Sequence, residues 1–333
     1  WILLTLRSFF CICFQSTVSK ALNDAPDISE ALRKQVLETA VALGYTKLRR
    51  YKKPTKKVCI IIEKENMRYQ EPHHFAYDIL VGFRQMAEPA GFDVEIVPVD
   101  IKTQRNQHYD VFMLEHDYIG AFVVGFSLSD PWIQDFKVSR TPAVLFDNYM
   151  VGNPSTAYVG IDNEEGMELA VSYLAGLGHR KIAYLSSSLG ARVLQARHAA
   201  FLRSMHQHGL KTSPAAIGCS YYLSECMEKH LPRFLENGIT AIICNQDTLA
   251  SATLTQCQQL GFQIPDDISI IGFDDLPIAA CTSPPLTTIR QDRLELGKSG
   301  FFALSSLLNH IPISTYLLHA QLIQRESTGK VPS

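Results

Sequence analysis

From residue 58 onward, short apolar runs rich in valine and isoleucine alternate with longer amphipathic stretches. Runs of this length and composition are typical of buried parallel strands, and the stretches between them are typical of connecting helices. The pattern therefore predicts α/β units with a parallel sheet and helices on both of its faces. The expected strands are 58–62, 94–99, 121–126, 143–146, 158–161, 181–185, 241–244, 268–273 and 287–289.

The number of expected strands and the chain length favour two lobes. A common open sheet has about five or six strands, and a domain usually has ~100–200 residues, whereas this chain has 333 residues. We expect two doubly wound lobes rather than one large sheet. The expected helices of these lobes include 75–87, 165–176 and 196–208.

Polar side chains follow most of the expected strands at the point where each strand ends. In doubly wound sheets, ligands bind beyond the carboxyl ends of the strands. Carboxylates, amides and hydroxyls at one edge suit a sugar, because each sugar hydroxyl both donates and accepts hydrogen bonds. The same residue types cap helices, so both roles stay open for each of them. The set includes Ser127, Asp147, Asp162, Asn245 and Asp274.

Charge is distributed unevenly along the chain. Residues 1–57 hold eleven Lys and Arg against four Asp and Glu, although the whole chain has a formal net charge of −2. A basic amino-terminal segment on an acidic body indicates that the two parts meet different partners. Nucleic acid is the first candidate partner for the basic segment.

Signatures of catalysis, cofactors and membranes do not occur in the sequence. It has no GxGxxG after the first strand, no GxxxxGK[ST] and no GxSxG, and no stretch approaches the ~18 apolar residues of a membrane span. The eight cysteines form no CxxC pair, which favours a reducing compartment. We expect no catalytic residue, no cofactor, no metal site and no membrane contact, and a cytoplasmic location. An enzyme whose site assembles from distant loops is the lowest-ranked alternative.

The basic segment contains two expected short helices. The first covers 16–23, and the second begins after Ser29, which can accept a hydrogen bond at its amino terminus. The second helix carries Leu32, Val36 and Leu37 on one face and ends at Gly44. Helices this short need tertiary packing to be stable.

This segment resembles the lactose-repressor/galactose-repressor family of bacterial transcription regulators. Thr-Val-Ser-Lys-Ala-Leu-Asn at 17–23 is similar to the recognition helix of that family, and residues 28–45 are similar to its third helix. The resemblance continues through the body in order and spacing. It includes Leu-Gly-His-Arg-Lys-Ile-Ala at 177–183, Gly-Phe-Asp-Asp at 272–275, Ser-Pro-Pro-Leu-Thr-Thr-Ile-Arg-Gln at 283–291 and Arg-Glu-Ser-Thr-Gly at 325–329.

The resemblance implies an α/β effector domain of two doubly wound lobes with the periplasmic-binding-protein fold, preceded by a small all-α helix-turn-helix headpiece that is incomplete here. The implied headpiece is 1–45, the basic hinge is 46–57, and the effector-binding domain is 58–331. Its first lobe covers about 58–160 and 290–317, and its second lobe covers about 161–289 and 318–331. The resemblance also implies a homodimer that binds operator DNA.

The resemblance assigns the first short helix to the major groove of DNA. Amide, hydroxyl and ammonium groups can read base edges there, and other polar side chains of the same helix contact phosphates. For the lysine, a phosphate contact is an almost equal interpretation. The implied base readers are Gln15, Ser16 and Lys20, and the implied phosphate contacts are Thr17, Ser19 and Asn23.

Two regions depart from the family pattern. Residues 1–14 are apolar and do not match the polar, alanine-rich first helix of the family, which we interpret as a truncated or frame-shifted start; the alternative is a variant that binds DNA poorly. The hinge is short, and seven of its twelve residues are basic. Within it, Leu48 is the candidate for a minor-groove wedge, and Arg49 and Arg50 are candidates for phosphate contacts.

The resemblance places a small polar effector, a sugar or sugar derivative, between the two lobes. Its binding would shift the equilibrium between two states of the protein and so change operator affinity. Alternatives of the same fold are a solute-binding protein and a ligand sensor without DNA binding. The implied effector residues are His74, Phe75, Tyr77, Ser127, Asp147, Asp162, Arg197, Asn245, Asp274 and Gln291.

Overall fold

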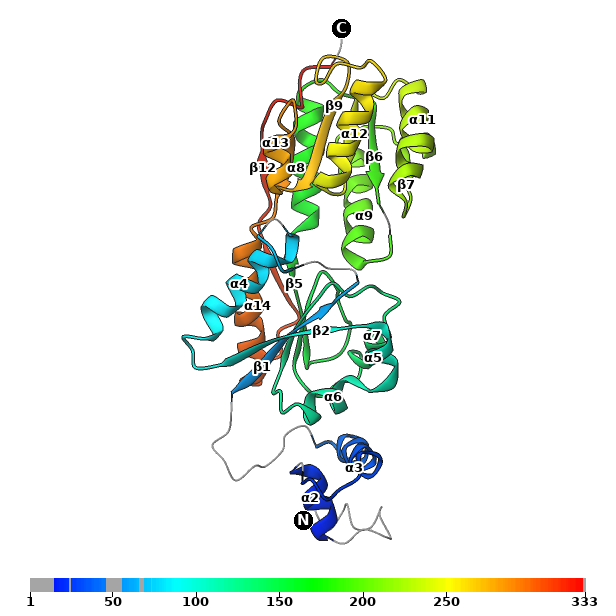
Figure 1. The fold of residues 1–333 in the computed structure, drawn as a ribbon. Coiled ribbons are helices and arrows are strands. Elements are labelled where there is room, and N and C mark those ends of the chain that lie inside the picture. Colours follow the sequence, from blue (N-terminus) through cyan, green and yellow to red (C-terminus); the bar gives the residue numbers. More distant parts are fainter. Residues whose placement is uncertain are drawn as a thin grey trace. The chain divides into compact units, whose positions relative to one another are not determined.

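The computed structural model describes residues 15–23, 25–45, 56–65, 69–72, 74–187 and 189–331 (Figure 1). The chain forms two compact units. The first contains 1–68, 79–159 and 297–316, and the second contains 69–78, 160–296 and 317–333. Residues 69–78 and 290–296, expected in the first lobe, cluster with the second unit, where Arg293 Nη2 lies 2.8 Å from Asp78 Oδ2.

A six-stranded sheet forms the centre of the first unit, with the strand order β11-β5-β4-β3-β1-β2. The strand pairs β1–β2, β1–β3, β3–β4 and β4–β5 are parallel, as the buried apolar runs predicted. The strands are β1 (Lys57–Glu63), β2 (Asp93–Val99), β3 (Ala121–Val124), β4 (Ala143–Phe146), β5 (Thr156–Ile161) and β11 (Thr315–Leu318).

Helices cover both faces of this sheet, because successive side chains of a strand point to opposite sides. On one face, Phe122 of β3 stacks on Phe83 with ring centroids 5.2 Å apart. On the other face, Ile61 and Val123 pack in one cluster with Phe112 and Trp132. The helices on the first face are α4 (Phe75–Ala87) and α14 (Arg293–Leu308). The helices on the other face are α5 (Ile101–Asn106), α6 (Tyr109–Glu115) and α7 (Trp132–Asp135).

The second unit repeats this plan with a six-stranded sheet in the order β12-β10-β9-β8-β6-β7. Its strands are parallel except β12, which runs antiparallel to β10. The fold class predicted from the sequence, two doubly wound lobes, is thereby confirmed. The strands are β6 (Ile182–Ser186), β7 (Ile217–Cys219), β8 (Ala241–Cys244), β9 (Ser269–Asp274), β10 (Thr287–Arg290) and β12 (Gln321–Ile323).

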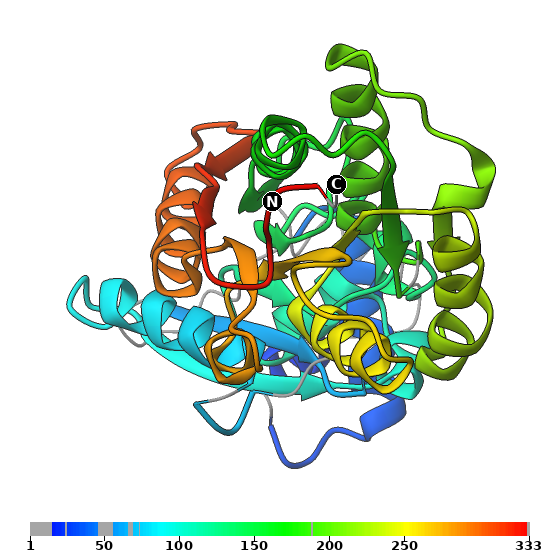
Figure 2. The same cartoon turned by 90° about the horizontal axis from the view of Figure 1, so that it is seen from above.

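Two apolar clusters fill the two faces of this second sheet. Ile243 and Phe273 point to one face, where they pack with residues of α8 and α9. Ile242 and Ile270 point to the other, where they pack with residues of α11 and α12, and Figure 2 shows α12 (yellow) across the sheet from α8 (green). The helices are α8 (Asn163–Gly176), α9 (Arg192–Gln207), α10 (Leu223–Glu225), α11 (Leu231–Glu236), α12 (Asp247–Gln259) and α13 (Pro277–Cys281), with short 3-10 and π turns at Pro214–Ala216 and Cys226–His230.

The Leu-Gly-His motif and the carboxy-terminal tail hold each other in place. The buried His179 ring lies 2.9 Å from Thr240 Oγ1 through Nδ1 and 3.1 Å from the Gly329 carbonyl through Nε2. Burial lowers the pKa of His179 below its ordinary value, so the ring is neutral near pH 7. Ser327 Oγ donates to the Ile270 carbonyl at 2.6 Å, which fixes the tail against β9.

The amphipathic patterns predicted the helices more closely than the edge strands. The expected helix 75–87 has the bounds of α4, whereas β7, β11 and β12 were not expected. These three strands have three or four residues each. β11 is mostly exposed, and β12 has one exposed and two half-buried residues, so both lack the buried apolar run that marks a central strand.

Two helices form the described part of the amino-terminal segment, α2 (Gln15–Leu22) and α3 (Glu30–Ala42). Ser29 caps α3 as expected, accepting a hydrogen bond from Leu32 N at 3.4 Å. Val18 and Ala21 of α2 pack against Val36 of α3. The predictions for residues 1–14 and for Leu48, Arg49 and Arg50 lie outside the described residues.

We predict that Gly297→Ala destabilises the protein, because α14 crosses α4 at this glycine. A Cβ at position 297 would lie 2.0 Å from the Ile79 carbonyl oxygen, which is backbone and cannot rotate away. Forcing extra volume into such a contact costs about 1–3 kcal/mol. Urea unfolding monitored by circular dichroism should show a lower midpoint.

The matched control is Gly176→Ala at the end of α8, where nothing lies within 4 Å of an added Cβ. Alanine is the better helix former by up to about 1 kcal/mol, so this variant should be neutral or slightly stabilised. An unchanged midpoint for Gly297→Ala would contradict the close helix contact.

Candidate functional site

Three polar side chains gather at the carboxyl edge of the second sheet. Asn245 directly follows β8, Asp274 is the last residue of β9, and Gln291 directly follows β10. These strands are parallel neighbours, so their ends meet at one edge. All three residues are buried. Gln291 Nε2 donates to Asp274 Oδ1 at 2.5 Å, which joins two of the three directly.

Arg197 of α9 extends into this cluster and is itself buried. Its Nε donates to Asn163 Oδ1 at 2.8 Å, and its Nη1 donates to the Asn245 carbonyl at 2.8 Å. The guanidinium carbon lies 3.7 Å from the ring centroid of Phe273. These contacts fix the planar fork of Arg197 in one orientation, as a binding group for a polar ligand requires.

Asp274 is the charged partner of Arg197, at 3.7 Å from Nη1 to Oδ1. Burial raises the pKa of Asp274 to about 6, and Arg197 and Gln291 oppose that rise. The backbone is left-handed at Asp274, with φ 112°, and at Asp275, with φ 52°. Such strain in non-glycine residues is held by the surrounding structure and clusters at functional sites.

Asp275 turns away from this cluster into a second ionic group. Its carboxylate accepts from Arg290 Nε at 2.7 Å and from Arg325 Nη2 at 2.6 Å. These two hydrogen bonds to arginine keep the pKa of Asp275 below its ordinary value although burial raises it. The adjacent aspartates therefore have different roles, and Asp275 anchors the turn that presents Asp274.

Asp247, the first residue of α12, lies behind the same turn and is fully buried. Its Oδ1 accepts from Thr288 Oγ1 at 2.6 Å and its Oδ2 accepts from Leu276 N at 2.7 Å. Burial and then the nearby charge of Asp274 raise the pKa of Asp247 to about 8. The carboxyl group is therefore protonated near pH 7.

Two exposed tyrosines at the same edge were not expected from the sequence. Tyr221 and Tyr222 follow β7 closely, and they are 78% and 63% exposed. Their rings meet edge to face, with centroids 5.4 Å apart. Large aromatic side chains at a ligand-binding edge can stack on flat apolar faces. The adjacent Tyr-Tyr pair was a usable signal, but β7 has three residues and its pattern did not reveal the strand.

A different kind of surface lies on α2. Ser16, Ser19, Lys20 and Asn23 are exposed, whereas Val18 on the opposite side is buried against α3. Asn23 Nδ2 donates to the Ser19 carbonyl at 2.7 Å, and Lys20 forms an ion pair with Asp27. This hydrogen-bonded pair lowers the pKa of Asp27. Both partners are about half exposed, and such exposed ion pairs contribute little to stability.

Comparisons with known proteins bear on both surfaces. The model of the periplasmic binding protein-like domain matches residues 171–328. The HTH-type transcriptional repressor PurR of Aliivibrio salmonicida is 27% identical over 95% of this chain and 96% of its own length. A regulatory protein of the LacI family from Chloroflexus aggregans has a TM-score of 0.71 at 26% identity, over 82% of this chain and 98% of that one.

The chain is thus similar over most of its length to regulators of the LacI family. The family predicted from the motifs agrees with these comparisons, in which the relatives are transcriptional regulators and residues 171–328 match a periplasmic-binding-protein-like domain. A transcriptional regulator named CelR, solved as a complex with cellobiose, has the same fold at 20% identity, with a TM-score of 0.71 over 98% of this chain and 99% of that chain.

The structure also shows the local surroundings of the other residues that the family resemblance implied. Asp162 caps α8 by accepting from Glu164 N and Glu165 N. Ser127 and Asp147 belong to the first unit, where they follow β3 and β4. The remaining three lie at the start of α4. They are His74, Phe75 and Tyr77.

Within the part of the chain that the structure describes, no group of three or more His, Cys, Asp or Glu could hold a metal ion. None of the described helices has the length and apolarity that crossing a bilayer requires.

We predict that Asp247→Asn makes the stability of the protein less dependent on pH. The pKa of Asp247 rises from its ordinary 3.8 to about 8 in the folded state, so the folded state binds this proton more tightly than the unfolded state. The resulting stabilisation is complete below about pH 4 and is lost as the pH rises through about 8. Asparagine keeps an oxygen for Leu276 N and stays uncharged.

The measurement is the urea midpoint at several pH values between about 6 and 9. The midpoint of the natural protein should fall more across this range than that of Asp247→Asn. Parallel pH profiles for the two proteins would show that Asp247 does not titrate there.

Proposed function

We propose that this chain is a repressor that binds operator DNA through α2 and whose operator affinity is set by a small polar effector held at the carboxyl edge of the second sheet. The observation that carries this proposal is the buried Arg197–Asp274–Gln291 cluster, whose donors and acceptors are already oriented. A family regulator needs such a cluster to recognise a ligand, and an ordinary apolar core does not.

The effector in this proposal is an uncharged sugar or sugar derivative. Arg197 already faces the carboxylate of Asp274, so the cluster has no uncompensated positive charge for an anionic ligand. Together, arginine, carboxylate and amide groups can donate hydrogen bonds to sugar hydroxyls and accept hydrogen bonds from them. Tyr221 and Tyr222 offer ring faces for the apolar side of a pyranose. The cellobiose complex of CelR shows that this fold accommodates a sugar.

The remaining implied effector residues stay part of the proposal. They supply further carboxylates, hydroxyls, an imidazole and aromatic rings near strand ends or at the start of α4. They are His74, Phe75, Tyr77, Ser127, Asp147, Asp162 and Asn245.

In the DNA complex, α2 enters the major groove and places Ser16 and Lys20 at base edges. Thr17, Ser19 and Asn23 contact phosphates. Gln15 would join the base readers, and the hinge residues Leu48, Arg49 and Arg50 would contact the minor groove and the backbone. The regulator acts as a homodimer in the cytoplasm, without catalysis and without a cofactor.

The DNA part of the proposal is tested by selecting binding sequences from a random duplex pool with the full chain. Fluorescence anisotropy then compares the natural protein with Lys20→Ala on the selected duplex. Loss of a base contact lowers the binding free energy by about 1–3 kcal/mol. Loss of a phosphate contact instead lowers the slope of log K against the logarithm of the salt concentration by about one. Either result supports a DNA-contacting Lys20. If no sequence is enriched and Lys20→Ala binds duplex DNA equally well, the chain is a sensor that does not bind an operator through α2.

The effector part is tested by the melting temperature of the purified protein with a panel of mono- and disaccharides and nucleosides. A ligand at about 100 times its Kd stabilises by about 2.7 kcal/mol, which is a shift of several degrees. We expect a sugar to give this shift and Arg197→Lys to abolish it, because lysine lacks the planar fork.

The matched control for this measurement is Arg203→Lys on the same helix, where Arg203 is exposed and paired with Glu164. It should keep the full shift. A shift that survives in Arg197→Lys, or a response to nucleosides alone, would refute the sugar assignment.

A further inference from the structure

The helix α3 has a second apolar face, which packs against α6. Leu37 and Ala40 on this face are 2% and 0% exposed. They form one cluster with Val111 and Leu114 of α6, which belongs to the first unit. We call these four residues the α3–α6 seam.

The seam uses side chains that neither helix needs elsewhere. In α6, Tyr109, Phe112 and Met113 point into the core of the first unit, whereas Val111 and Leu114 cluster only with the amino-terminal helices. A short helix that is apolar on all sides is buried on all sides. If α3 did not dock on α6, the two outward residues of α6 would be exposed to water, and so would Leu37 of α3.

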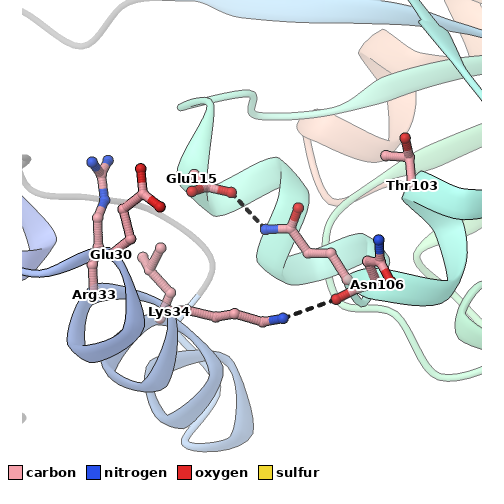
Figure 3. A pocket seen from close by; sticks show the side chains of 8 residues that line it. Glu30, Arg33, Lys34, Thr103, Asn106 and Glu115 are labelled. Atoms are coloured by element: carbon pink, nitrogen blue, oxygen red, sulfur yellow. Dashed lines mark hydrogen bonds between the residues drawn. The ribbon is translucent and has the colours of Figure 1, made fainter.

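Two cations border the seam, each near the carboxyl end of a helix on the other side. Lys34 Nζ of α3 donates to the Asn106 carbonyl at the end of α5, at 3.0 Å (Figure 3). The guanidinium of Arg140 lies against Gly44, where a Cβ would be 2.0 Å from Nη1. The carboxyl end of a helix carries partial negative charge, so both contacts favour docking.

A cavity of about 500 Å³ lies beside the seam. Figure 3 shows side chains from both parts around it, with Glu30 and Arg33 on α3 and Glu115 on the side of α6. Gln107, which also lines the cavity, donates to Glu115 at 2.6 Å. The apolar contact is therefore limited in extent and has a polar, open side. Such a contact can hold a small helix pair and can also be released at modest cost.

We propose that the first lobe is the folding partner of the α2–α3 pair, and that the α3–α6 seam fixes the direction of α2 on that lobe. Leu22 of α2 packs in both apolar clusters, so it connects α2 to the seam. Ser16, Ser19 and Lys20 remain exposed in the docked arrangement. A change in the first lobe then reaches α2 through packed side chains as well as through the hinge.

The test is hydrogen exchange, followed by mass spectrometry, on the full chain without DNA or sugar. In Leu114→Glu, amides of α2 and α3 should exchange about tenfold faster or more, whereas β1 and β3 keep their protection. A tenfold faster exchange corresponds to a decrease of about 1.4 kcal/mol in the free energy of local opening. The matched control is Val138→Glu in the same unit, where the side chain is 72% exposed; it should leave α3 unchanged.

A second variant keeps the test decisive if Leu114→Glu also unfolds the lobe. In the double truncation Val111→Ala with Leu114→Ala, faster exchange confined to α2 and α3 supports the seam. Unchanged exchange in α3 with a folded lobe overturns it. Because neither DNA nor an effector is present, this failure would leave the proposed regulatory function untouched.

Discussion

Parallel pairing of neighbouring strands is the constraint on which the functional surface of this protein depends. It brings the carboxyl ends of β8, β9 and β10 to one edge, so three polar side chains far apart in sequence become neighbours. A buried arginine would be costly on its own. Here the neighbouring strand ends supply a carboxylate and a carbonyl, and α8 supplies the amide of Asn163. The sheet topology and the ionic cluster are therefore one feature.

Much of what surrounds this cluster stabilises it rather than contacting a ligand. Asp247 holds the Leu276 amide, and Asp275 ties the turn after β9 to Arg290 and Arg325. These contacts maintain a left-handed backbone at two successive aspartates. The motif Gly-Phe-Asp-Asp is thus a structural unit in which the second aspartate anchors the first.

The sequence was sufficient to predict the central strands, the helices α4, α8 and α9 and the similarity to known regulators, because buried apolar runs and ordered motifs are local signals. It was not sufficient for β7, β11 and β12, which are short or exposed. Among the site residues, Arg197, Asn245, Asp274 and Gln291 are brought together. Asp162 caps α8. Distinguishing a cap from a ligand contact requires knowing where the next helix begins, which periodicity does not fix to one residue.

The α3–α6 seam has a consequence for building hybrid regulators. Exchanging DNA-reading modules between relatives is usually designed by cutting in the linker, as if the two parts were independent. In such a hybrid, Leu37 of the transplanted helices would be exposed to water. To bury it, the recipient body would need apolar residues at the positions of Val111 and Leu114. The natural boundary for recombination therefore includes two residues that lie well beyond the linker in the chain.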